Sequence, residues 1–223
     1  MVLIAVHGSA SRFLPPERGT VQLSVGLEHD DRATVVQEVA ALHERFVADA
    51  KSFVHAGTAT WWGSDQVHVR AERRYRKDSE TQYTVQVAST EVLVKFRDFG
   101  ALSEWIDRAG SVPGTSIGGI DWTVTEVRRT EVEREVRVEA VQDAVRRAEA
   151  YASAIGGNGV TLEAVWEPGL RPNASGSEGG AYLSRALAVS GSYSSIELRP
   201  DDIEIAAAVT ADFTVTGRPT VAP

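Results

Sequence analysis

The stretch VEREVRVEAVQDAVRRAEAYASAI, residues 132–155, carries the strongest structural signal in this chain. Its apolar and small side chains recur every three or four residues, the spacing that places them on one face of an α-helix. They are Val132, Val136, Ala140, Val141, Ala144, Val145, Ala148, Ala152 and Ile155. Glu and Arg fill the opposite side, and the glycine-rich run 156–159 ends the pattern. We predict a helix over residues 130–155 whose alanine-rich face lets another element approach closely.

Strands are predicted on both sides of this helix. Alternating apolar residues indicate strands at 2–9, 20–27, 120–124, 160–166 and 203–215. A long hairpin is predicted from 67–75 and 83–87 around a polar turn at 77–80, and its second strand continues past a bulge through 92–96. Residues 114–119 are predicted to form a turn because three glycines fall within six positions.

Two further helices are predicted, each from a cap and a periodic apolar pattern. In the first, an apolar pattern from Val35 to Phe53 follows the candidate caps Asp30, Asp31 and Thr34, and Gly57 is a natural stop. In the second, Asp98 is the predicted N-cap, and Gly110 follows the apolar residues Leu102, Trp105, Ile106 and Ala109. Three helices with strands mostly in hairpin order predict an α+β fold with mostly antiparallel sheets.

Size and composition are those of a folded globular protein. The chain has 223 residues, of which 43% are hydrophobic and 24% charged, so it can bury a core without disulfides or metals. We predict a single domain over residues 1–216 and a flexible tail over 217–223. The chain has no cysteine, which excludes thiol catalysis and every cysteine-based metal site.

Charge and hydropathy bear on partners and compartment. The formal net charge is −8, which opposes binding to nucleic acid or to anionic membranes. Residues 1–8 have no positive segment before their short apolar run, unlike a signal peptide. No apolar run approaches the ~18 residues of a membrane span. We therefore expect a cytoplasmic protein with no membrane span and no nucleic-acid partner.

No candidate catalytic motif in this sequence has the structural context that its chemistry requires. Residues 114–118, GTSIG, fit the G-x-S-x-G elbow of α/β-hydrolases, but that elbow needs a strand before Ser116 and a helix after it. The predicted order here is the reverse, and all five histidines precede Ser116. The histidines lack metal-site spacing, and the glycine-rich segments lack a phosphate-binding signature. The sequence thus predicts no catalytic residue, no cofactor and no metal.

Two features are candidate interaction surfaces. Trp61 and Trp62 are adjacent, and neighbouring residues of a strand point to opposite faces, so one indole is exposed unless a partner covers it. Packing of one ring in the core and the other against a loop is one interpretation; an interface is the other. The segment 168–180 is rich in Gly, Pro, Ser and Asn and is a second candidate.

Four stretches together resemble the SIMPL-domain family. The first is a short apolar strand with Gly8, followed by Pro15-Pro16 and the strand from Thr20. The second runs from Gln82-Tyr83 through VLVKFRD (92–98) and the helix at 102–106 to IGGI (117–120). The third and most specific is AVQDAVRRAEAYA (140–152), and the fourth is IELRPDDIEI (196–205). The order of these motifs over residues 2–216 carries the resemblance.

The resemblance implies an α+β fold with no known catalytic residues and no cofactor. Some relatives are exported bacterial envelope proteins that form ring- or channel-like homo-oligomers, and some are linked to stress responses. The absence of a recognisable leader departs from those exported relatives. We expect a non-enzymatic homo-oligomeric scaffold or interaction protein. The alternative is a ligand- or protein-binding module that uses Trp61, Trp62 or the 168–180 segment.

Overall fold

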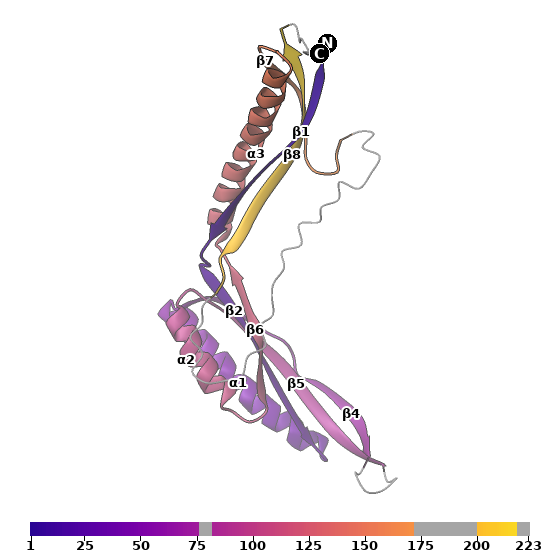
Figure 1. Ribbon diagram of the computed structural model, residues 1–223. Helices are drawn as coiled ribbons and strands as arrows, with labels where there is room; N and C mark the ends of the chain where they lie inside the picture. Colours follow the sequence, from indigo (N-terminus) through magenta and orange to yellow (C-terminus); the bar gives the residue numbers. More distant parts are fainter. Residues whose placement is uncertain (76–81, 172–199, 218–223) are drawn as a thin grey trace. The chain divides into compact units, whose positions relative to one another are not determined.

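The computed structural model describes residues 1–75, 82–171 and 200–217, which divide into two compact units (Figure 1). Among the described residues, the first unit takes 1–15, 124–171 and 202–217, and the second takes 16–75, 82–123 and 200–201. Within each unit, antiparallel strands form a sheet that carries helices on one face, which confirms the predicted α+β class.

The first unit is a three-stranded sheet with one long helix. Its strands, in the order β1 (Leu3–Leu14), β8 (Ile203–Thr216) and β7 (Gly159–Trp166), are antiparallel. Helix α3 (Glu126–Ala154) lies along this sheet, as Figure 1 shows. Val209, Ala211 and Phe213 of β8 pack in its core. The alternate residues Thr210 and Asp212 therefore point to the face opposite α3.

The alanine-rich face of α3 approaches β1 very closely. Ala140, Ala144, Ala148 and Ala152 are fully buried, which confirms the predicted narrow face. A Cβ added to Gly8 would lie 2.2 Å from the Ala140 carbonyl oxygen and 2.6 Å from the Ala144 nitrogen. The helix packs against the strand at this distance only because residue 8 has no side chain.

The second unit is a five-stranded sheet with two helices. Four strands lie in the order β3 (Ala59–Ser64), β5 (Gln82–Phe96), β2 (Arg18–His29) and β6 (Thr115–Thr123), and β4 (His68–Tyr75) also pairs with β5. Helices α1 (Arg32–Ala56) and α2 (Phe99–Gly110) pack on the face that carries Val21, Leu23 and Val25. Phe46, Phe96 and Trp105 fill this core.

Asp31 and Asp98, among the predicted N-caps, and Gly57, as a predicted helix stop, are confirmed. Asp31 is the N-cap of α1, where its carboxylate accepts a 2.8 Å hydrogen bond from the Thr34 backbone N–H. Gly57 ends that helix in the left-handed conformation with φ of 74°, which glycine adopts without strain. Asp98 caps α2 by accepting from the backbone N–H groups of Gly100 and Ala101.

Several boundaries differ from the prediction. Residues 59–64 form a strand that the pattern did not indicate, and 115–119 belong to β6 rather than to a turn. The extra residue in β6 is a bulge at its glycine pair, which explains the misleading turn signal. Helix α3 begins at Glu126 rather than at 130, and β1 continues to Leu14. The predicted turn at 77–80 and most of 168–180 lie outside the described residues.

The boundaries of domains stay a prediction. Two compact units do not by themselves make two domains, so the single domain predicted for residues 1–216 is neither confirmed nor contradicted. The tail at 218–223 lies outside the described residues.

Candidate functional site

The two edge strands of the first unit expose large apolar side chains. In the described part of the chain, β1 and β7 each pair with β8 on one side only. Leu3 and Phe13 of β1 are 57% and 62% exposed, and Leu162 and Val165 of β7 are 45% and 41% exposed. Glu163 is the single charged residue of β7. An apolar edge with so little charge is open to pairing with another strand.

A bulge in β7 places its two exposed apolar residues on the same face of the sheet. Leu162 lies opposite Phe213 of β8, and Val165 lies opposite Ala211. Phe213 and Ala211 both belong to the core under α3, so Leu162 and Val165 point to that side of the sheet. The register shifts between Leu162 and Ala164, which is the bulge.

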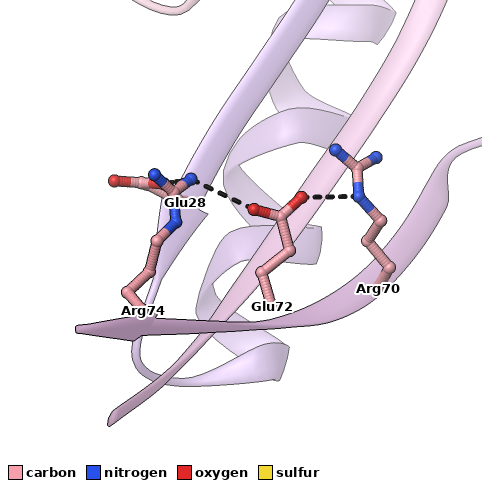
Figure 2. A network of polar contacts seen from close by, with 4 residues as sticks. All are labelled: Glu28, Arg70, Glu72 and Arg74. Carbon is pink, nitrogen blue, oxygen red and sulfur yellow. Dashed lines mark hydrogen bonds and ion pairs between the residues drawn. The ribbon is translucent and has the colours of Figure 1, made fainter. Parts of the chain in front are cut away.

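Strand β4 of the second unit is, by contrast, protected by charge. Figure 2 shows four alternating charges that lie side by side. Glu72 accepts hydrogen bonds from Arg70 at 2.8 Å and from Arg74 at 3.1 Å, and Arg74 also donates to Glu28 of β2 at 2.9 Å. The hydrogen bond from Arg70 is the main cause that lowers the pKa of Glu72 below its usual value. Charged residues on an edge strand discourage pairing with another sheet.

Trp61 and Trp62 point to opposite faces of the second sheet. The register between β3 and β5 shifts between Ala59 and Trp61, so Trp61 lies opposite Lys95 and Trp62 opposite Val94. Trp62 packs against the core, as the interpretation with one buried ring requires. Trp61 is 50% exposed, with the Lys95 ammonium 5.9 Å from its ring centre. It lies on the sheet face opposite the helices rather than against a loop.

Polar side chains continue this face beyond Trp61. The Gln22 amide donates to Glu91 at 2.9 Å, and the Ser24 hydroxyl donates to the same carboxylate at 3.4 Å. Gly63 lies beneath the Trp61 ring, because a Cβ at residue 63 would come within 2.7 Å of it. The result is a half-exposed aromatic ring on the same sheet face as these hydrogen-bonding groups.

An ion pair on the first sheet was not predicted. Asp212 of β8 is only 8% exposed, and Nη2 of Arg171 donates to both of its oxygens at 2.9 and 3.1 Å. The Arg171 guanidinium also lies 5.6 Å from the ring centre of Trp166, the last residue of β7. One signal was available in the sequence, because Asp212 is the single charged residue of the apolar run 205–216 in β8.

The residues weighed for catalysis lie apart. Ser116 is exposed on β6, where β2 is its pairing partner. His7, His29, His55 and His68 are exposed and His43 is half-buried. Among the described residues, no three His, Asp or Glu side chains lie close enough to hold a metal ion. No helix in the same residues is long and apolar enough to cross a membrane.

The comparison with protein families matches nearly the whole chain. A family model described as "SIMPL: Protein of unknown function (DUF541)" covers residues 4–213. The chain belongs to the SIMPL family. The match includes residues of both compact units of this SIMPL protein, and it confirms the resemblance inferred from the four motifs. No curated protein matches the chain.

Proposed function

We propose that this SIMPL protein is a non-enzymatic interaction protein that assembles with its own copies through the edge strands of the three-stranded sheet. The observation that carries the proposal is the exposure of Leu162 and Val165 on β7, an edge strand with one charged residue. Pairing such an edge removes apolar surface from water and satisfies backbone groups at the same time.

The same-face position of Leu162 and Val165 suits an antiparallel pair of β7 strands. In one register, Leu162 of each copy lies opposite Val165 of the other, and apolar pairs on one face stabilise a sheet. Strand β1 gives each copy a second edge, with Leu3 and Phe13 exposed. A chain with two edges binds two neighbours, which a closed ring requires.

The test is the particle mass of the purified protein over a wide concentration range, measured by mass photometry and light scattering. The double variant Leu162→Lys, Val165→Lys should shift the assembly to smaller species, because it places like charges on the paired edge. Tyr83→Lys is the matched control, since Tyr83 is 46% exposed on the charged hairpin of the second unit. A wild-type chain that stays monomeric throughout, or a double variant that assembles like wild type, would contradict the proposal.

A second candidate function is ligand binding at the Trp61 face. The half-exposed indole, on the same sheet face as the hydrogen-bonded Gln22 and Glu91, favours a ligand with a flat apolar face and hydroxyl groups, such as a sugar ring. Titration with short oligosaccharides should change the tryptophan fluorescence of wild type. That change should be lost in Trp61→Ala and kept in Lys51→Ala, which removes the cation 5.6 Å from Trp62 on the opposite face. No response from wild type would contradict this function.

Two expectations remain predictions. They are the cytoplasmic location and the stress-related role, the second of which rests on the resemblance to other family members. Neither affects the assembly experiment, which tests the interaction proposal by itself.

A further inference from the structure

Asp212 is a buried charge in an unexpected place. It lies in the central strand of the first sheet, between Ala211 and Phe213 in the sequence, and it is 8% exposed on the face opposite α3. A carboxylate at such a position is stable only with a partner that replaces its lost hydration. Arg171 supplies this partner from the segment that follows β7.

The two neighbouring strands present small side chains beside this carboxylate. Ala5 of β1 and Ala164 of β7 lie directly opposite Asp212. Residues directly opposite in a sheet point to the same face, so each neighbour contributes only a methyl group there. The carboxylate is therefore flanked by methyl groups and remains accessible to a cationic side chain from above the sheet.

The β7 bulge produces this arrangement. Without the shift between Leu162 and Ala164, Glu163 would lie opposite Asp212, and like charges directly opposite each other destabilise a sheet. The bulge places Ala164 there instead, and it pairs Trp166 with Thr210 on the same face. Bulges commonly redirect side chains next to functional sites. Here the redirected residue is Trp166, whose ring contacts the Arg171 guanidinium.

The two sides of this ion pair come from different kinds of structure. Asp212, Ala164 and Trp166 belong to paired strands. Arg171 follows a turn in which the Leu170 N–H donates to the Glu167 carbonyl at 3.1 Å and Gly169 has a φ of 81°. The Arg171 side chain keeps 31% of its exposure, so its guanidinium can be reached from solvent. A rigid carboxylate with an aromatic wall is a recognition site for guanidinium.

We propose that Asp212 and Trp166 form a guanidinium-binding socket in which Arg171 is a tethered, replaceable occupant. Its ligand class is the arginine side chain of a polypeptide. The tether gives Arg171 an effective concentration on the order of millimolar or higher, so an outside guanidinium competes poorly while Arg171 is present. The inference does not depend on self-assembly or on the Trp61 face.

Chemical rescue tests the socket. The Arg171→Ala variant lacks the guanidinium but keeps the socket residues Asp212 and Trp166. Ethylguanidinium at low millimolar concentration should therefore bind to it and raise its Tm. The rise should be about 3–5 °C at a concentration about ten times the Kd. Ethylammonium, which lacks the planar fork, should give a smaller rise. Wild type should respond much less to ethylguanidinium than the variant does.

Matched variants decide the outcome. Arg171→Ala combined with Asp212→Asn should lose the response, and Arg128→Ala should behave as wild type, since Arg128 pairs with Glu131 on α3. If Arg171→Ala does not fold, Arg171→Gln serves in its place. The proposal is overturned if ethylguanidinium raises the Tm of the folded variant no more than ethylammonium does. A rise that persists without the Asp212 carboxylate, or that is equal in wild type, would overturn it as well.

Discussion

At the scale of single residues, Gly8 sets the distance between α3 and β1. A Cβ at this position would meet the backbone of Ala140 and Ala144, and backbone atoms cannot move aside as a flexible side chain can. The neighbouring strand residue adds a polar contact, because the Ser9 N–H donates to Asp143 of α3 at 3.2 Å. Packing and hydrogen bonding thus depend on the same close approach.

Gly8→Ala is expected to lower the free energy of unfolding by about 2 kcal/mol or more, since overpacking a well-filled interior forces backbone shifts. Urea unfolding followed by circular dichroism measures the change. Gly110→Ala is the control, because a Cβ at residue 110 meets nothing within 4 Å. The control should be neutral or slightly stabilising at this helical position. Equal effects of the two substitutions would contradict the role of Gly8.

Asp143 should make stability depend on pH in the acid range. Hydrogen bonding from the Ser9 N–H, followed by the charge of Arg147, lowers the pKa of Asp143 below its usual 3.8, against the opposing effect of burial. A carboxyl whose pKa is lower in the folded state stabilises the fold above 3.8, and this stabilisation is lost as the pH falls through the folded-state pKa.

We therefore expect Asp143→Asn to be less stable than wild type at neutral pH and to lose less stability between about pH 5 and pH 2. Denaturant unfolding at several pH values measures both curves. Asp107→Asn, an exposed carboxylate on α2, is the control substitution. Parallel curves for wild type and Asp143→Asn would show that the contact with Ser9 does not affect folding.

At the scale of elements, bulges position the residues of the proposed binding surfaces, and caps fix where helices begin. The bulge in β3 sends Trp61 to the face opposite the helices, and the bulge in β7 brings Ala164 beside Asp212. The N-cap of α1 is an equally local device. The sequence offered Asp30, Asp31 and Thr34 as caps, and in the fold Asp31 is the N-cap and accepts from the Thr34 N–H.

Asp31→Ala should therefore cost about 1 kcal/mol of stability, the usual effect of removing an N-cap, whereas Asp30→Ala should cost much less. Chemical unfolding of the two variants under identical conditions compares them directly. The opposite order would assign the cap to Asp30.

At the scale of the whole molecule, apolar exposure differs in kind between the two units. Among the described residues, the exposed large apolar residues of the second unit are Trp61, Tyr75 and Tyr83, which all carry a polar group. The exposed large apolar residues of the first unit include Leu3, Phe13, Leu162 and Val165. These four lie on the edge strands β1 and β7, which carry few charges. This contrast is why the proposed assembly uses the first unit.

Self-assembly should strengthen as salt is added. Each copy carries a net charge of −8, so copies repel one another, and screening shortens the range of that repulsion from about 10 Å at 0.1 M to about 3 Å at 1 M. The apolar contact between edges is not weakened by salt in this way. Mass photometry at low and high sodium chloride should show a larger share of the assembled species at high salt. Dissociation by salt would instead indicate an interface held by ion pairs.

The sequence by itself determined the α+β class, the three helices with the caps of α1 and α2, and the alanine face of α3. These depend on local periodicity and on the conformational preferences of Asp and Gly, which are readable over a few residues. The family was likewise recognisable from four ordered motifs. Local patterns also mislead at 115–119, where the two glycines of a bulged strand resemble a turn signal.

Only the tertiary structure decided which residues meet. Arg171 and Asp212 are 41 positions apart, and no periodicity relates them. The edge position of β7, the side to which Leu162 and Val165 point, and the sheet face of Trp61 follow from strand order and from single-residue register shifts. A shift of one residue moves a side chain to the other face of a sheet, and it arises from pairing between distant segments. The alanine row of α3 predicts that another element packs closely against it. Only the fold shows that this element is β1 and that the close approach is at Gly8.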